Sequence, residues 1–96
     1  MSLREADPDD AFCAYAIAME HAKAGRVEEA IRWLDETLRL DAGHAYACYQ
    51  KARLLGDVGR TEEAAAMIDA GLRIAESAND DKAAEELREL RAAMLG

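Results

Sequence analysis

The sequence has little of what a sheet-based, secreted or membrane protein needs. Proline occurs once, and the β-branched residues valine and isoleucine are scarce, which argues against a large sheet. No apolar run approaches the roughly 18–20 residues of a membrane span. The N-terminus is acidic, whereas a secretion signal begins with basic and then apolar residues. We therefore expect a helical protein of the cytoplasm, without a membrane segment.

Cysteine and basic residues are also in short supply. Cys13 and Cys48 are the only cysteines and form no CxxC pair, so we expect two reduced thiols rather than a disulfide framework. Lysine and arginine number 12 against 20 acidic residues, which gives a net charge of −8. Because phosphate binding requires clustered cations, this charge excludes nucleic acids and anionic membrane surfaces as partners. It favours a neutral or basic partner instead.

Residues with catalytic or metal-binding potential are few and poorly placed. The chain has two serines, two threonines and no glycine-rich phosphate loop. Neither Cys13 nor Cys48 has a histidine four residues later, metal-like spacing or a base beside it. His21 falls at a core position facing its own second helix and His44 in a turn, so we interpret both as structural. The sequence predicts no enzyme, no metal site and no cofactor.

What the sequence has is an internal repeat with a period of 34 residues. Residues 11–44 align with residues 45–78 without a gap, and eleven of the 34 aligned pairs are identical. These pairs are Ala11/Ala45, Tyr15/Tyr49, Ala18/Ala52, Gly25/Gly59, Arg26/Arg60, Glu28/Glu62, Glu29/Glu63, Ala30/Ala64, Asp35/Asp69, Leu38/Leu72 and Arg39/Arg73. Such a period is typical of stacked repeats, in which each unit buries its apolar face on a neighbour.

Each unit is predicted to contain two helices separated by a glycine, Gly25 or Gly59. The predicted helices cover residues 9–24, 27–40, 44–57 and 61–77. Thr61 is the predicted N-cap of the last of these. Before the first helix, Asp7 and Pro8 fit an N-cap and a first helical residue, or else the end of a preceding repeat.

The segment after residue 78 departs from the period. Asn79, Asp80 and Asp81 supply an N-cap and acidic residues for a first helical turn. Apolar residues then recur at spacings of four, three and four: Ala83, Leu87, Leu90 and Met94. One apolar stripe on an otherwise charged helix is what the open end of a repeat stack requires. We predict a capping helix at about residues 80–95.

Four positions of each unit carry a resemblance to a known repeat family. Three positions hold small residues and one a bulky residue: Ala18/Ala52, Ala30/Ala64 and Thr37/Gly71, with Leu34/Ile68. Together with the Gly-Arg-x-Glu-Glu-Ala run at residues 25–30 and 59–64, they resemble the tetratricopeptide repeat pattern. The sequence departs from that pattern where a bulky residue or a proline is replaced, at Ala14, Cys48, Ala42 and Glu76.

The resemblance implies an all-α, right-handed helical-repeat solenoid of five helices. It implies one domain over residues 1–96, with repeat 1 at about 11–44, repeat 2 at about 45–78 and the capping helix at its end.

In this family the first helix of each repeat lines a concave groove, and the resemblance implies that this groove is the binding surface. The corresponding residues are Phe12, Tyr15, Met19, Tyr46, Tyr49, Gln50 and Arg53. They include four of the five aromatic residues, and Tyr, Phe, Met and Arg are typical of interaction hot spots. The alternative is structural: the tyrosines wedge between helices, or the last helix folds over them.

Two functions of different classes follow from these features. The first is a module that binds a peptide or helix of a partner protein, of apolar or mixed sequence with neutral or basic flanks. Some members of the family hold a C-terminal carboxylate with Lys and Asn, a clamp that Tyr15, Met19, Tyr49 and Arg53 do not reproduce. The alternative is a structural module that forms a homodimer or docks onto the rest of a larger multi-repeat protein.

Overall fold

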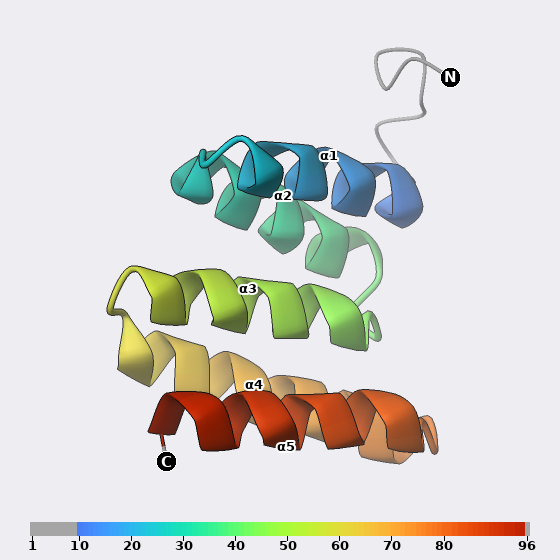
Figure 1. Cartoon of the computed structure of the whole chain (residues 1–96). Coiled ribbons are helices and arrows are strands. Elements are labelled where there is room, and N and C mark those ends of the chain that lie inside the picture. The colour runs from blue at the N-terminus through green and yellow to red at the C-terminus, as the bar shows by residue number, and fades with distance from the viewer. Residues whose placement is uncertain (1–9, 96) are drawn as a thin grey trace. The chain divides into compact units, whose positions relative to one another are not determined.

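The computed structural model describes residues 10–95, and within this range it contains five α-helices and no strand. In chain order they are α1 (Ala11–Lys23), α2 (Val27–Leu40), α3 (Ala45–Asp57), α4 (Thr61–Ser77) and α5 (Asp81–Leu95) (Figure 1). The all-α class and the capping helix are therefore confirmed. The chain forms two compact units, whose boundary in the sequence lies between Ala42 and Gly43.

Unit 1 is a pair of packed helices, α1 and α2. Its buried side chains are Cys13, Ala14 and Ala18 on α1 and Ala30, Ile31, Leu34 and Thr37 on α2. Ala14 stands where the repeat family has a bulky residue, and it is nevertheless almost completely buried. The apolar stripe predicted from helical spacing thus forms the contact between the two helices.

Unit 2 contains α3, α4 and α5, with α4 packed against both of the others. Its core cluster draws on all three helices: Ala45, Ala52, Ile68, Ala75, Ala83, Ala84 and Leu87. Several helix contacts depend on small residues, since most of these side chains are alanine. At Gly71 of α4 there is no room for any side chain, because a β-carbon there would lie 3.0 Å from Cβ of Cys48 and 3.1 Å from both methyl carbons of Leu87.

Three helices end in the same hydrogen-bonded turn, and in each a residue with positive φ makes the turn possible. After α1 this residue is Gly25 (φ 81°), after α3 Gly59 (φ 81°) and after α4 Asn79 (φ 55°). In the first turn Arg26 N donates to His21 O (2.9 Å) and Gly25 N to Ala22 O (3.1 Å). This pair of hydrogen bonds is a Schellman motif, which satisfies carbonyls that a helix end leaves unpaired. The predicted glycine turns are confirmed.

The predicted N-cap is correct for α5 and wrong for α4. An N-cap from the run Asn79 to Asp81 was predicted, and Asp80 is the residue that caps α5, accepting a hydrogen bond from Ala83 N (3.1 Å). Thr61 is not the N-cap of α4: the prediction is wrong, because Arg60 occupies the cap position without a side-chain cap bond and Thr61 is the first helical residue. Glu62 and Glu63 in the first turn supply negative charge to that helix end instead.

α1 begins at Ala11, two residues later than expected, and Asp10 is its N-cap. The Asp10 carboxylate accepts a hydrogen bond from Phe12 N (2.8 Å). Asp7 and Pro8, the predicted cap and first helical residue, lie outside the described residues.

Candidate functional site

The α1 face that the resemblance assigns to a groove carries Phe12, Tyr15 and Met19. Their spacing of three and then four residues places them on one side of the helix. Phe12 is 74% exposed, while Tyr15 and Met19 are half-buried. No charged residue lies between Ala11 and Met19. Unit 1 therefore presents an uncharged strip whose outermost member is a large exposed aromatic ring.

The corresponding face of α3 is more closely tied to the core of its own unit. Tyr46 and Tyr49 both pack against the unit 2 core cluster, and their rings meet edge to face with centroids 6.4 Å apart and planes at 65°. That cluster includes Ala83, Ala84 and Leu87 of α5. The two tyrosines thus have a structural role in unit 2, whatever else they contact.

The polar end of the α3 face is held by bonds along the helix. Arg53 Nε donates to Gln50 Oε1 (3.0 Å), and an Arg53 terminal nitrogen lies 3.7 Å from Asp57 Oδ2. Arg53 and Gln50 are both half-buried. These contacts align the guanidinium along the helix surface, next to the two tyrosines in sequence.

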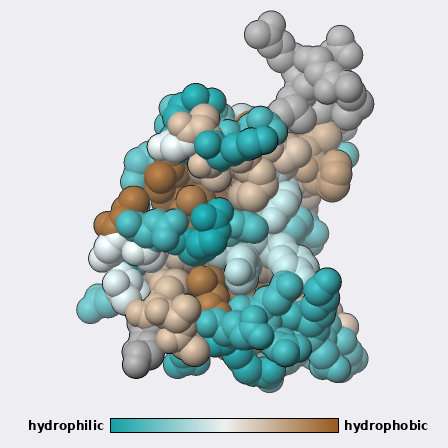
Figure 2. All heavy atoms as spheres, in the orientation of Figure 1, coloured by the Kyte–Doolittle hydropathy of each residue, from teal (hydrophilic) through white to brown (hydrophobic). Residues whose placement is uncertain are grey.

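Two large hydrophobic side chains are exposed in the part of the chain that the structure describes, Phe12 and Val58. Val58 is 46% exposed and is the C-cap residue of α3, outside the predicted site. Figure 2 shows hydrophilic atoms over most of α5 on the face turned to the viewer. Phe12 is the larger and more exposed of the two residues.

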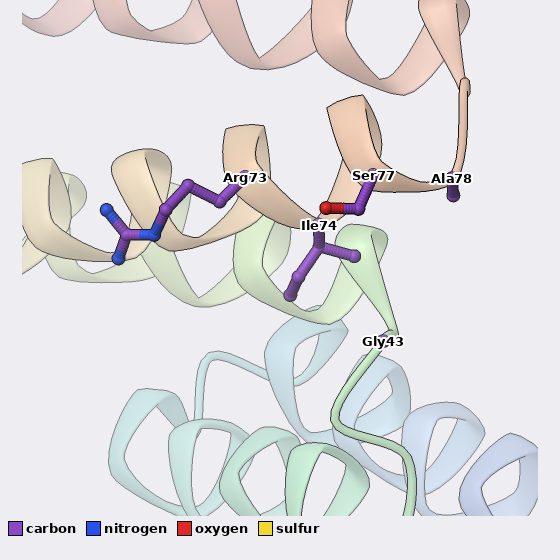
Figure 3. A pocket seen from close by; sticks show the side chains of 5 residues that line it. All are labelled: Gly43, Arg73, Ile74, Ser77 and Ala78. Carbon is purple, nitrogen blue, oxygen red and sulfur yellow. The ribbon is translucent and has the colours of Figure 1, made fainter.

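Unit 2 also contains an open pocket of about 390 Å³ that no predicted site residue lines. Its lining residues are Gly43, Arg73, Ile74, Ser77 and Ala78, from the turn before α3 and the last turns of α4. Figure 3 shows Ile74 and Ser77 on the side of α4 that is turned toward Gly43. The sequence did not reveal this pocket because a turn residue and a helix end, about 30 residues apart, share no periodic pattern.

The thiols and imidazoles lie in structural positions. Cys13 and Cys48 are buried thiols that form no disulfide within residues 10–95, and burial raises the pKa of the Cys48 thiol although Lys51 opposes the shift. A thiol that stays protonated is a poor nucleophile. His44 is the N-cap of α3 and accepts a hydrogen bond from Ala47 N at Nδ1 (3.1 Å). Among the described residues, no three His, Cys, Asp or Glu side chains gather as a metal would require.

His21 joins the α1–α2 turn to α2. Its Nδ1 accepts a hydrogen bond from Arg26 Nε (2.9 Å) and lies 3.3 Å from Glu29 Oε2. One nitrogen cannot serve both partners in one protonation state: neutral Nδ1 accepts from Arg26, and protonated Nδ1 donates to Glu29. The contact with Arg26 is the shorter of the two. The predicted position of His21, facing its own second helix, is confirmed.

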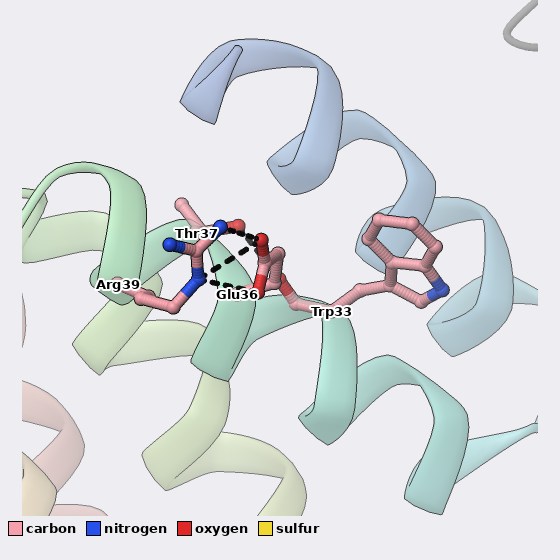
Figure 4. A network of polar contacts seen from close by, with 4 residues as sticks. All are labelled: Trp33, Glu36, Thr37 and Arg39. Atoms are coloured by element: carbon pink, nitrogen blue, oxygen red, sulfur yellow. Dashed lines mark hydrogen bonds and ion pairs between the residues drawn. The ribbon is translucent and has the colours of Figure 1, made fainter. Parts of the chain in front are cut away.

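The polar contacts of α2 support the helix rather than a site. Arg39 Nε donates to Glu36 Oε2 (2.9 Å), and this hydrogen bond lowers the pKa of Glu36 (Figure 4). Thr37, completely buried, donates from Oγ1 to the carbonyl of Trp33 (2.8 Å). A buried hydroxyl is tolerated here because the helix itself supplies its acceptor.

Comparison with solved structures gives matches over nearly the whole chain. A crystal structure of a tetratricopeptide repeat domain protein from Salinibacter ruber is 25% identical, with a TM-score of 0.84 over 91% of this chain and 97% of that one. A solution NMR structure of a tetratricopeptide repeat domain protein from the same organism is 26% identical, with a TM-score of 0.85 over 93% and 90%. No family model matches the sequence, and no curated protein matches it.

These similarities confirm the resemblance seen in the sequence: the chain has the tetratricopeptide repeat fold. The residues at the family's small and bulky positions are all buried: Ala18, Ala30, Leu34, Thr37, Ala52, Ala64, Ile68 and Gly71. The fold is of a scaffold type that serves protein interactions. Within residues 10–95, no helix is long and apolar enough to cross a membrane.

Proposed function

We propose that this protein binds a peptide or helix of a partner protein through the first helices of its repeats, with Phe12 of α1 as the principal anchor. The observation that carries the proposal is the 74% exposure of Phe12. A phenylalanine side chain is stabilised by roughly 1.5–3 kcal/mol when it moves from water to an apolar site. A partner that covers Phe12 gains this free energy, and aromatic anchors of this kind are typical of interface centres.

Tyr15 and Met19 extend the anchor along α1. Both are half-buried, so each retains surface that a partner can cover. Tyrosine contributes a large rigid surface with a polar end, and methionine adapts its shape to different partners. Because α1 carries no charge before Glu20, the matching segment of the partner is apolar.

On α3 the proposed contacts are fewer. Tyr46 and Tyr49 are partly used by the unit 2 core, so only their remaining surface is available. Gln50 and Arg53 provide a polar edge beside them. The net charge of −8 favours neutral or basic residues in the flanks of the bound segment, since acidic flanks are repelled at long range.

The experiment is a selection of peptides from a random phage-displayed library on the full chain, followed by affinity measurements on two variants. Phe12→Ala removes the proposed anchor. Val58→Ala is the matched control, because it removes the other exposed large hydrophobic side chain, at the end of α3. We expect selected peptides to be apolar and to bind Phe12→Ala at least about tenfold more weakly, a loss of about 1.4 kcal/mol. Binding to Val58→Ala should be unchanged.

Peptides that bind both variants equally well would contradict the assignment of Phe12. Thermal unfolding of each variant is measured in parallel, so that loss of binding is not confused with loss of fold. Self-association is the competing use of the same face. Light scattering at high concentration tests it, and a wild-type dimer that Phe12→Ala converts to a monomer would replace the peptide proposal by a dimer interface.

A further inference from the structure

The unit 2 pocket combines an apolar wall with a cation. Ile74 and Ala78 contribute aliphatic surface, Ser77 contributes a hydroxyl, and Arg73 contributes a guanidinium. All four lie along the last turns of α4 or directly after them, and Gly43 closes the opposite side (Figure 3). The volume of about 390 Å³ is at the small end of the range of small-molecule sites.

Arg73 has no side-chain partner among the described residues, although the chain is strongly acidic. Two neighbours explain this. Asp69, one helical turn earlier, lies 3.4 Å from a guanidinium nitrogen of Arg91 on α5. The residue three positions before Arg73 is Ala70, whereas the equivalent Arg39 of the first repeat has Glu36 at that spacing and pairs with it. The acid that holds an arginine in repeat 1 is therefore missing in repeat 2.

We propose that this pocket binds a carboxylate carried on a short aliphatic group. The guanidinium presents planar, paired N–H donors that match the two oxygens of a carboxylate. Figure 3 shows the Arg73 side chain extending along α4 away from Ser77, so the guanidinium holds the carboxylate without a hydrogen bond from the Ser77 hydroxyl. Ile74 and Ala78 remove aliphatic surface of the ligand from water. Either a free short-chain acid or the last residue of a peptide has this chemistry.

The acidic surroundings limit the affinity without abolishing the site. Glu76 lies three residues after Arg73 and competes with a bound carboxylate for the guanidinium, yet no ion pair joins the two within the described residues. Repulsion from the more distant acids is screened over about 8 Å at physiological ionic strength. A bidentate contact acts at hydrogen-bond distance and is far less affected. The proposal is independent of the peptide-binding function of α1, since it concerns other residues of the other unit.

The test is an NMR titration of the full chain with N-acetyl-leucine, N-acetyl-leucinamide and isovalerate, following the backbone amides of Gly43, Ser77 and Ala78. N-acetyl-leucine and its amide differ only in the carboxylate. We expect saturable shifts with the two acids and binding at least about tenfold weaker with the amide, a difference of about 1.4 kcal/mol. Tighter binding of N-acetyl-leucine than of isovalerate identifies a peptide end as the source, and the reverse identifies a free acid.

Three variants locate the site. Arg73→Gln should weaken acid binding at least about tenfold, and Ala78→Leu, which fills the pocket but keeps the charge, should do the same. Arg32→Gln is the matched control: Arg32 is an exposed arginine on α2 with no side-chain partner among the described residues, outside this pocket. Its loss should leave binding unchanged. Equal binding of acid and amide, no saturable shift, or equal effects of Arg73→Gln and Arg32→Gln would overturn the proposal.

Discussion

Gly71 of α4 lies directly against Cys48 of α3, so close that a β-carbon on Gly71 would be 3.0 Å from Cβ of Cys48. The same β-carbon would lie 3.1 Å from both methyl carbons of Leu87, on α5. All three helices of unit 2 meet at this residue, and Cys48 and Leu87 are each 1% exposed. The absence of a side chain at position 71 is therefore a condition for the packing of unit 2, not only a feature of the repeat pattern.

Replacing Gly71 by Ala should destabilise the protein. Alanine gains about 1 kcal/mol of helix propensity over glycine, but overpacking a core costs typically about 1–3 kcal/mol. The cost should prevail, because Cβ of Cys48 is fixed to its backbone and cannot rotate away. We expect a net loss of about 1 kcal/mol in the free energy of unfolding, measured by urea denaturation.

Gly56→Ala is the matched comparison for that experiment. Its new β-carbon would meet Met94 Cε at 2.7 Å, which is the movable end of a flexible side chain on α5. Met94 can change rotamer, so the propensity gain should dominate and the variant should be stabilised, by up to about 1 kcal/mol. If Gly56→Ala and Gly71→Ala changed stability equally, the close contact at Gly71 would have no energetic weight.

The turn glycines lead to a prediction about backbone conformation. Gly59 has φ 81°, and apart from its two chain neighbours no residue has an atom within 4 Å of the place that a β-carbon would occupy, so strain in the backbone decides the cost of a substitution. Gly59→Ala should lose roughly 1–2 kcal/mol. Gly59→Asn should lose less, because Asn79 already adopts positive φ in the equivalent turn after α4. Thermal unfolding of the two variants checks the order.

The burial of Cys48 predicts a loss of stability in alkali. Burial raises the pKa of its thiol above 9.0, so on going to high pH the unfolded chain releases this proton before the folded one. The unfolded state is then favoured as pH rises through and above about 9, and this penalty is absent at neutral pH. In Cys48→Ala, which copies Ala14 of the first repeat, stability should fall less steeply over this range. Identical slopes for the two proteins would argue against a buried thiol.

The helices and their packing were accessible from the sequence because they depend on local spacing. The 34-residue period, the glycine turns and the apolar stripes all describe contacts within one or two helices, and α2 and α4 have the predicted bounds. The cap of α4 was missed, since the threonine at its start is one residue too late to accept the cap bond. Spacing alone did not distinguish a side chain that is exposed from one that its own unit covers.

Phe12 and Tyr46 show that difference most clearly. They are equivalent residues of the two repeats, yet Phe12 is 74% exposed and Tyr46 packs on the unit 2 core. What changes is the rest of the unit: the core beneath Tyr46 includes residues of α5, which lies outside the repeat. The pocket at Arg73 was missed for a similar reason. The Arg73 guanidinium is left without Asp69 as a partner because Asp69 pairs with Arg91 of α5, which lies outside the repeat.

An exposed anchor residue and a core residue should differ in how much their loss destabilises the protein. Tyr49→Ala should lower the free energy of unfolding by about 1–3 kcal/mol, because its ring packs on the core cluster and meets the ring of Tyr46. Phe12→Ala should change stability by less than about 0.5 kcal/mol, as expected for an exposed position. Denaturation of both variants measures the difference. A large loss on Phe12→Ala would mean that the ring is covered in solution, and the exposed anchor on α1 would then have to be abandoned.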